Sequence, residues 1–321
     1  MKHPSQEPKL SEPKRPASRW HGLFGLIAVA GILPAVADPA EAGDASPYAT
    51  QVVSYDPGSP APPLNDPTLA LGEPTRDTGF GGFTQVVSPF YPAFTNIVSI
   101  GPGGHLTLAF DTPIVNDPNH PFGIDLIVFG NSFFTDTASP NGVVGGLFKD
   151  GGLIEVSQDG EDWFTVPDIE ADGLYPTLGY TDAGPYDTAS GRVETDFSRP
   201  VNPALTLDDF LGLTHEDLVE IYDGSGGGAG IDLSTVGVNE ILYVRISHAE
   251  GAFGTVEVDA VSRTFPQVFA DLNGDGVVNV FDLLILLENW GVPSQGGSSA
   301  DLNNDGVVNV FDLLLLLENW G

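Results

Sequence analysis

The chain has 321 residues, with 44 acidic side chains against 11 basic ones and a formal net charge of −33 at pH 7. This length accommodates one large domain and one small domain. A surface this anionic repels phosphate backbones, so the composition excludes a nucleic-acid partner. The chain contains no cysteine, which excludes disulfides and thiol chemistry.

The N-terminal stretch has the organisation of an export signal. Five of the basic residues lie in the first nineteen positions, and the apolar stretch "GLFGLIAVAGILPAVA" and the small-residue segment "ADPAEAGDA" follow. This order predicts a signal peptide over residues 1–42, cleaved after Ala37 or Ala42. The alternative is a retained membrane anchor, which the short apolar core and its interruption by Pro34 disfavour. We therefore expect a mature chain without a membrane span, secreted or held at the cell surface.

The segment from residue 43 to about residue 100 is rich in Pro, Gly and Ser and predicts extended stretches and turns. Beyond it, strand-like runs alternate with turn signals. These runs cover residues 105–110, 124–130, 153–157, 163–167, 241–247 and 254–262. In the first run, Leu106, Leu108 and Phe110 fall on one face, as in a sheet with one wet side.

Turn and cap signals complete the prediction for the body of the chain. Asp159-Gly160 predicts a tight hairpin turn. A helix is predicted at residues 206–222, where Thr206 and Thr214 each precede an aspartate by three residues, as helix N-caps do. The many short strands predict a mainly β fold, in which residues 43–268 form an antiparallel β-sandwich of jelly-roll type.

Two stretches of the body resemble known families. The hairpin "VSQDGEDWFTV" resembles one that recurs in discoidin-like, galactose-binding β-sandwiches. The wider run from "GHLTLAFDTPIV" through "GIDLIVFGN" to "EVSQDGEDWFTVP" is similar to a family of uncharacterised exported bacterial surface proteins. The first resemblance implies the sandwich fold, and the second implies a surface protein without an established activity.

The body offers no recognisable hydrolase motif. Its histidines are scattered along the sequence, at His105, His120, His215 and His248. Neither an H-E-x-x-H pair nor a G-x-S-x-G elbow is present, which disfavours zinc and serine hydrolases. A glycosidase needs only two suitably spaced carboxylates, so a hydrolase acting on O-glycosyl bonds stays open, with unknown catalytic residues.

Two other segments of the body have both a functional and a structural interpretation. The Gly-rich segment at residues 223–234 is interpreted as a flexible connector rather than a phosphate loop, because no lysine accompanies it. Asp111, Asp117 and Asn119 are a candidate cation site, although turn chemistry explains the same residues equally well.

Three tyrosines lie close together in the sequence. Tyr175, Tyr180 and Tyr186, with nearby aspartates, form a candidate platform for sugar stacking. The favoured alternative is a long loop that packs its own aromatic rings onto the sandwich. Carbohydrate is thus a candidate ligand of the body.

The C-terminal segment is a nearly perfect repeat. "DLNGDGVVNVFDLLILLENWG" at residues 271–291 returns as "DLNNDGVVNVFDLLLLLENWG" at residues 301–321. Each copy places oxygen-bearing groups at positions 1, 3, 5, 7, 9 and 12 and glycine at position 6, which is the spacing of a calcium loop. The predicted ligands are Asp271, Asn273, Asp275, Val277, Asn279 and Asp282 in the first loop, and Asp301, Asn303, Asp305, Val307, Asn309 and Asp312 in the second. We therefore predict two bound Ca²⁺ ions, against the alternative of a pair of acidic turns.

A loop followed by a helix, duplicated in tandem and without an entering helix, resembles the type I dockerin domain of cellulosome-like enzymes. The resemblance covers residues 269–321. It implies two units that pack on each other, two calcium ions, and docking onto a cohesin domain of a scaffold protein. It also implies an association with polysaccharide-degrading enzymes or carbohydrate-binding modules.

The helices depart from the family pattern. Positions 10 and 11, where family members often carry hydroxyl residues that touch cohesin, are Val280-Phe281 and Val310-Phe311, and the family's basic residues are missing. The helix "FDLLILLENW" is apolar on nearly every side until Glu288, so more than one of its faces has to be covered. One face is expected to meet the sister repeat, because a single loop–helix unit cannot bury its own apolar side. The other face needs the sandwich or a partner.

These observations predict an exported, calcium-binding protein with a non-enzymatic β-sandwich body of binding or structural role. Residues 269–321 would attach it to a cohesin-like or other surface protein. The alternatives are a glycoside hydrolase and a carbohydrate-binding component of a degradative complex.

Overall fold

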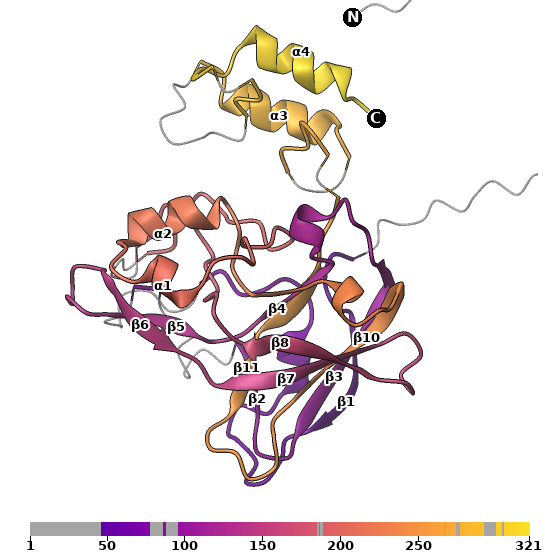
Figure 1. The fold of residues 1–321 in the computed structure, drawn as a ribbon. Coiled ribbons are helices and arrows are strands. Elements are labelled where there is room, and N and C mark those ends of the chain that lie inside the picture. The colour runs from indigo at the N-terminus through magenta and orange to yellow at the C-terminus, as the bar shows by residue number, and fades with distance from the viewer. Residues whose placement is uncertain are drawn as a thin grey trace, which may run out of the picture. The chain divides into compact units, whose positions relative to one another are not determined.

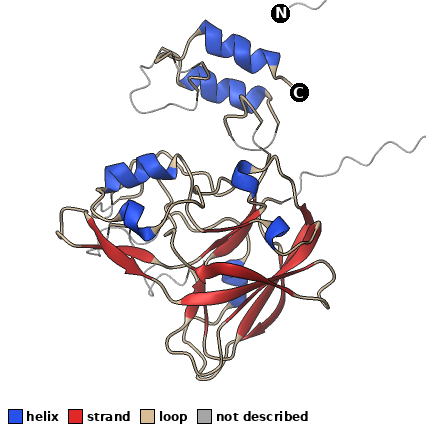
Figure 2. Ribbon diagram, in the orientation of Figure 1, coloured by secondary structure: helices blue, strands red, loops and turns tan. Residues whose placement is uncertain are grey.

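The computed structural model describes residues 46–77, 86–87, 96–184, 186, 189–266, 268–273, 277–291, 300–303 and 305–321. The predicted signal peptide lies outside these residues. Strands dominate the described body, and the described tail contains two helices (Figures 1 and 2). None of the helices in this part of the chain has the length and the apolar run that a membrane crossing requires.

The larger sheet contains five antiparallel strands in the order β1-β3-β10-β7-β8. They are β1 (Gln51–Asp56), β3 (His105–Val115), β10 (Glu240–Ser247), β7 (Gly151–Ser157) and β8 (Phe164–Asp172). β10 is central, with Val244 opposite Leu108 on one side and opposite Val156 on the other. β7 and β8 form the hairpin that Asp159-Gly160 predicts, with Gly160 at a φ of 78°.

Three smaller antiparallel sheets complete the body. The first contains β12 (Ala260–Arg263), β4 (Leu126–Phe129) and β9 (Ala229–Ile231), the second β11 (Val256–Val258) and β2 (Val98–Ile100), and the third β5 (Phe133–Asp136) and β6 (Val144–Phe148). Several of these strands have only three or four residues, which is too short for a clear alternation in the sequence.

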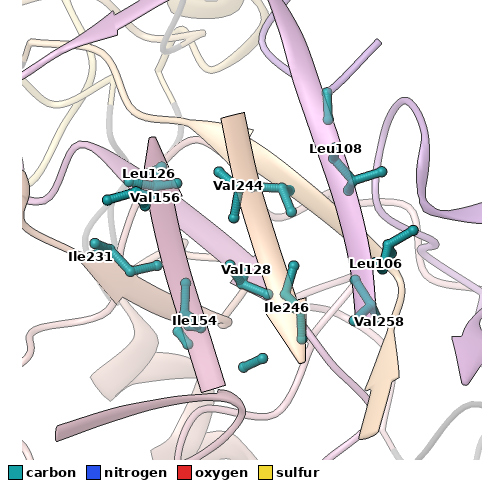
Figure 3. Packing of buried hydrophobic residues seen from close by; sticks show 14 of the residues in the cluster. Leu106, Leu108, Leu126, Val128, Ile154, Val156, Ile231, Val244, Ile246 and Val258 are labelled. Atoms are coloured by element: carbon teal, nitrogen blue, oxygen red, sulfur yellow. The ribbon is translucent and has the colours of Figure 1, made fainter. Parts of the chain in front are cut away.

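One hydrophobic core joins the large sheet to the β12-β4-β9 and β11-β2 sheets (Figure 3), while Phe134 of β5 and Val144 of β6 lie in a second cluster with Phe210 and Tyr222. The fully buried members of this core include Leu106, Leu108, Ile154, Val156, Val244 and Ile246 from the large sheet and Leu126, Val128, Ile231 and Val258 from the smaller sheets. Burying each such side chain stabilises the fold by about 1.5–3 kcal/mol. Sheets that face each other across a shared core form a β-sandwich, which confirms the predicted fold class.

The helix expected at residues 206–222 is two helices, so that prediction is wrong in its continuity. α1 covers Leu207–Phe210 and α2 covers His215–Tyr222. Both predicted caps are present, because the carboxylates of Asp209 and Asp217 accept the backbone N–H of Thr206 and Thr214, each at 2.8 Å. The second cap starts a new helix instead of continuing the first one. The described part of the body also contains three short 3₁₀ helices, at Pro67–Ala70 (η1), Pro121–Gly123 (η3) and Leu233–Thr235 (η4).

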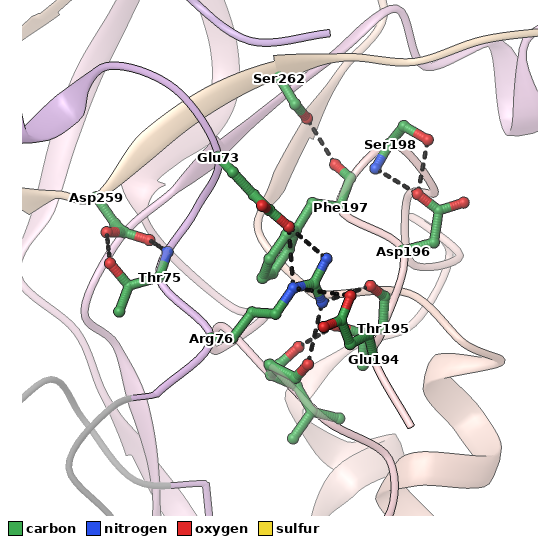
Figure 4. A network of polar contacts seen from close by, with 12 residues as sticks. Glu73, Thr75, Arg76, Glu194, Thr195, Asp196, Phe197, Ser198, Asp259 and Ser262 are labelled. Carbon is green, nitrogen blue, oxygen red and sulfur yellow. Dashed lines mark hydrogen bonds and ion pairs between the residues drawn. The ribbon is translucent and has the colours of Figure 1, made fainter. Parts of the chain in front are cut away.

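The single strand expected at residues 254–262 is also divided, into β11 and β12. The break is at Asp259, which is buried and accepts hydrogen bonds from the backbone N–H of Thr75 at 2.7 Å and from its hydroxyl at 2.9 Å (Figure 4). Burial raises the pKa of Asp259 to about 7. A polar anchor to a segment 184 residues away therefore interrupts an otherwise apolar run.

Arg76 fastens the same N-terminal segment to the region before α1 (Figure 4). Its guanidinium lies over the ring of Phe197 at 4.4 Å from the centroid and donates to the carbonyls of Gly179 at 3.2 Å and Thr195 at 2.8 Å. Glu73 accepts from its Nε at 2.9 Å. The guanidinium of Arg76 therefore has an aromatic ring at its face and oxygen acceptors for its N–H groups.

The Gly-rich segment is packed inside the body, so the expectation of a flexible connector is wrong. Residues 225–229 are all buried. A Cβ on Gly226 would lie 2.2 Å from Cδ1 of Phe197, and one on Gly228 would lie 2.5 Å from Cγ2 of Ile127. Glycine is needed here because another group occupies the place of a side chain.

We expect Gly226→Ala to destabilise the body by about 1–3 kcal/mol, because the added methyl group has to displace the buried ring of Phe197. Denaturant titration of the full chain measures the change. The control is Gly146→Ala, whose new Cβ would meet only the side-chain oxygen of Thr135, at 3.3 Å. An equal effect of the two substitutions would contradict the packing argument.

Candidate functional site

The two loop–helix units of the tail pack on each other as near-equivalent halves. α3 (Val280–Glu288) and α4 (Val310–Glu318) lie side by side (Figure 1). A small core lies between the units and consists of the buried residues Ala270, Val278, Leu286, Ala300, Val308 and Leu316. Leu286 and Leu316 hold the same position in the two helices and are both fully buried. This confirms that one face of each helix meets the sister repeat.

A pair of reciprocal hydrogen bonds joins the units. The N–H of Gly291, after α3, donates to the carbonyl of Val308 at 2.8 Å, and the N–H of Gly321, after α4, donates to the carbonyl of Val278 at 3.0 Å. Donors and acceptors in the two bonds are each thirty positions apart in the sequence. Exchanging the units therefore reproduces the contact, as in an isologous twofold interface.

Each loop passes into its helix through a capping box. Asn279 accepts the backbone N–H of Phe281 at 2.8 Å, and Asp282 accepts the backbone N–H of Asn279 at 2.7 Å. Asn309, Phe311 and Asp312 repeat the same two contacts at the same distances in the second unit. The residues predicted as ligands at positions 9 and 12 thus also satisfy the free N–H groups of a helix N-terminus.

The position-12 aspartates also bind the start of their own loops. The second oxygen of Asp282 accepts the N–H of Leu272 at 2.7 Å and of Asn273 at 3.2 Å. That of Asp312 accepts the N–H of Asn303 at 3.2 Å. Both carboxylates are completely buried. Each one therefore fastens the beginning of the loop to the beginning of the helix.

Described groups of the second loop converge on Asp305. Its Oδ2 accepts from Nδ2 of Asn303 at 3.0 Å and from Nδ2 of Asn309 at 3.3 Å. The same Nδ2 of Asn309 donates to the carbonyl of Val307 at 2.8 Å. Asp301 accepts the backbone N–H of Asp305 at 3.1 Å. Positions 1, 3, 5, 7 and 9 of the loop are therefore in mutual contact.

This donor set fits a hard dication. Carboxylate, amide and backbone carbonyl oxygens are the ligands that Ca²⁺ takes. The amide NH₂ groups of Asn303 and Asn309 bring partial positive charge to the oxygens of Asp305 and Val307. A rotation of each amide by half a turn would present its oxygen to the loop instead, but it would also withdraw that oxygen from the backbone N–H of Asp305 or of Phe311.

The acidic side chains alone do not form a metal site. Within the described ranges, no group of three or more His, Cys, Asp or Glu side chains is arranged so that it could hold a metal ion. Asp301, Asp305 and Asp312 are thus not gathered at one point, since Asp312 is engaged by backbone N–H groups. Of the predicted ligands in the first loop, Asp275 lies outside the described residues.

The outward faces of α3 and α4 are apolar. About half of the surface of Leu284 and Leu287 is exposed, at 51% and 47%, and the same holds for Leu314 and Leu317 of α4, at 51% and 49%. Val280, Phe281 and Trp290, with Val310, Phe311 and Trp320, extend these two exposed faces. The faces match in every residue because the helices match in sequence. We call this set of ten residues the paired apolar faces.

The acidic charge of the tail is unbalanced. From Thr264 to the C-terminus the sequence contains eight acidic residues and no Lys, Arg or His. Glu288 and Glu318 lie at the ends of the two helices and are exposed. The paired apolar faces are therefore bordered by negative charge alone.

Two tyrosines of the candidate sugar platform, Tyr175 and Tyr186, contact other residues of the body. The hydroxyl of Tyr175 donates to the carbonyl of Leu205 at 3.0 Å, and its ring meets Phe210 edge-on. Burial raises the pKa of Tyr175 to about 12. The hydroxyl of Tyr186 donates to Asp136. These contacts favour the loop that packs its own aromatic rings over the sugar platform.

The candidate cation site in the body is also better explained by local structure. Asp117 accepts the backbone N–H of Asn119 at 2.9 Å and its side-chain Nδ2 at 2.8 Å, which is a turn contact. Asp111 accepts the N–H of Ser46 at 3.1 Å and lies 3.6 Å from Arg263. Turn and ion-pair partners therefore account for both carboxylates.

Sequence reasoning did not foresee the double role of Asn279 and Asp282 and of their counterparts Asn309 and Asp312. The signal was present, because Asn-x-x-Asp before an apolar run has the spacing of a capping box. The calcium-loop spacing uses the same two positions, so the sequence pattern assigned them to the ion and not to the helix cap.

Comparison with known families agrees with the tail. No curated protein matches the chain. Residues 269–319 match the family model of the dockerin type I domain, and the match does not extend to the body. The loop–helix repeat, the reciprocal packing of its halves and this match together show a dockerin-like tail, and with it a role of the chain in protein–protein attachment.

Proposed function

We propose that this chain is an exported attachment protein. Its tail docks onto a cohesin-like or other surface protein through the paired apolar faces, with Ca²⁺ holding the loops, and its body has a binding or structural role and no catalytic one. The observation that carries this proposal is that the tail leaves two identical apolar faces exposed after its halves have covered each other.

The negative charge of the loops gives a physical reason for calcium binding. Each loop is predicted to hold three carboxylates within twelve residues, and no basic residue follows Thr264 to balance them. Repulsion between these groups opposes closure of the loop. A bound ion supplies the positive charge that the sequence lacks, and the oxygens of Asp305 and Val307 already meet at one group, the Nδ2 of Asn309.

The paired apolar faces favour one kind of partner. Contiguous exposed leucines and aromatic residues mark a site of association, because soluble proteins seldom leave such a surface uncovered. The acidic border favours a groove lined by apolar side chains and rimmed by Lys or Arg. A second copy of the tail would bring like charges together, so it is the less favourable occupant.

The predicted export signal supports a function outside the cytoplasm. The basic start, apolar core and small-residue segment of residues 1–42 support cleavage and release, as the sequence predicts. The lack of cysteine does not oppose this location, because the body has a continuous core of its own.

We expect calorimetry of the full chain to detect two bound Ca²⁺ ions. Asp282→Ala should remove one of them, because it deletes a predicted ligand and also frees the N–H groups of Leu272 and Asn279. Asp312→Ala should remove the other. The control is Glu288→Gln, which removes a charge of the same helix outside the loop.

Thermal unfolding in a chelator completes this experiment. The transition of the body should persist, because its core contains no predicted calcium ligand. Absence of calcium heat at about millimolar ion, or a stoichiometry that Asp282→Ala and Asp312→Ala leave unchanged, would contradict the calcium proposal.

We expect docking to tolerate a charge in one apolar face and to be lost when both carry one. Leu284→Glu or Leu314→Glu alone leaves the other face intact, so affinity for a cohesin-type partner should fall only about twofold. The double variant should lose on the order of tenfold to a hundredfold, since burial of one leucine contributes about 1.5–3 kcal/mol. Surface plasmon resonance of the full chain measures both effects.

The matched control places the same charge on an exposed apolar residue of the body. Val193→Glu should leave binding unchanged, because Val193 is 54% exposed and lies outside the tail. Two outcomes would contradict docking by the paired apolar faces: full binding by the double variant, or a loss caused by unfolding of the body.

A further inference from the structure

A cluster of acidic side chains lies where three sheets of the body meet. Asp172 is the last residue of β8 and pairs in register with Gly151, next to Asp150. Glu257 is the middle residue of β11. Gly130 follows β4 directly, and a Cβ on it would lie 2.7 Å from Oδ1 of Asp172. The carboxyl of Asp172 is therefore enclosed by parts of the large sheet, of the β11-β2 pair and of the β12-β4-β9 sheet.

Hydrogen bonds hold this cluster only in part. Oδ2 of Asp172 accepts the N–H of Asp150 at 3.2 Å, and the backbone of Ser132 also donates to this carboxyl. Glu257 accepts from Nδ2 of Asn131 at 2.7 Å and from the hydroxyl of Ser99 at 3.3 Å. These contacts connect the cluster to β2 and to the turn after β4.

Two buried polar atoms in this region lack a partner among the described residues. They are Oδ1 of Asp172 and Nε2 of His248. Asp172 is 0% exposed and His248 is 8% exposed, so both side chains are largely removed from bulk solvent. An unpaired charge in such a place is costly, whereas a protonated carboxyl is far less so.

The charged groups around the cluster are almost all acidic. Besides burial, the charges of Asp150 and Glu257 both raise the pKa of Asp172. Burial raises the pKa of Asp150, and His248 is the one basic group whose charge lowers it. On the neighbouring surface, Lys149 is paired with Glu170. No Lys or Arg of the described body therefore counts among the partners of these three carboxyls.

A metal ion is the other way to hold three carboxyls together. In the part of the chain that the structure describes, no three or more His, Cys, Asp or Glu side chains are arranged so that they could hold a metal ion. The side chains are thus close enough to repel one another but are not arranged around a common point. Protons, which bind one carboxyl at a time, suit this arrangement better.

We propose that Asp150, Asp172 and Glu257 form a pH-sensitive latch that joins three sheets of the body, closed while the cluster carries protons and loosened when it loses them. Burial and the neighbouring Asp150 raise the pKa of Asp172 to about 8. Burial raises the pKa of Glu257 and of Asp150 as well. A carboxyl whose pKa is raised in the folded state stabilises it most below the unfolded pKa, and this contribution is lost as the pH rises through the folded pKa.

The test is the melting temperature of the full chain, with its calcium, as a function of pH. Between about pH 5 and about pH 9 the transition of the body should fall by on the order of 5 °C or more. Asp172→Asn keeps the shape of the side chain but cannot ionise, so its transition should vary much less with pH and should exceed that of the wild type at about pH 9. Asp259→Asn is the control, because Asp259 is also buried. This variant should keep the larger part of the wild-type dependence of melting temperature on pH.

Infrared spectroscopy of the Asp259→Asn variant keeps the proposal testable if Asp172→Asn does not fold, because the raised pKa of Asp259 would otherwise add a band of its own. A carbonyl band of a protonated carboxylic acid should be present at neutral pH and should disappear as the body loosens above about pH 8. Three results would overturn the latch: no such band, an Asp172→Asn variant with the slope of the wild type, or a slope that a chelator or added Ca²⁺ abolishes. The last result would assign the cluster to a metal ion.

Discussion

The mutual burial of Leu286 and Leu316 is the contact on which the tail depends. Each helix carries more apolar surface than its own loop can cover, so neither unit has a stable fold without the other. The reciprocal bonds from Gly291 to Val308 and from Gly321 to Val278 fix the two units in equivalent positions. Because the copies are nearly identical, whatever one unit leaves exposed the other leaves exposed as well. The paired apolar faces are thus a direct consequence of how the repeat buries its core.

The loops and the helices of the tail are structurally coupled. Asp282 and Asp312 bind the start of the loop, the N-cap residue of the helix and, in our proposal, the ion. Closing a loop around Ca²⁺ therefore sets the beginning of its helix, and the helix places its leucines in the common core. In our proposal, ion binding and docking are coupled through these two buried carboxylates. The body in turn is built on a separate core, with polar anchors such as Asp259 and Arg76 between segments far apart in the sequence.

Sequence patterns predict much of the structure of the tail and less of the structure of the body. Oxygen donors at fixed positions follow a geometric requirement of the ion, so spacing alone identified the loops, and the match to the dockerin type I domain agrees. In the body, β3, β7 and β10 are long enough to be recognised as apolar runs, whereas β9 and β11 have three residues each. The one wet side expected for β3 is wrong, because residues 106–110 are all buried. The Gly-rich segment 223–234 looked flexible because its packing partners, Phe197 and Ile127, are far away in sequence. The break at Asp259 and the burial of Asp172 likewise depend on long-range contacts that no local pattern encodes.

Hydrogen exchange of two backbone amides tests the central claim most directly. The N–H groups of Gly291 and Gly321 form the reciprocal bonds between the units, while that of Val244 lies in the centre of the large sheet. In the full chain with calcium, we predict that both glycine amides are protected and that a chelator releases them together, with Val244 unaffected. Protection of Gly291 and Gly321 that persists in the chelator, or that is lost at one of them alone, would contradict a tail whose two halves fold as one calcium-dependent unit.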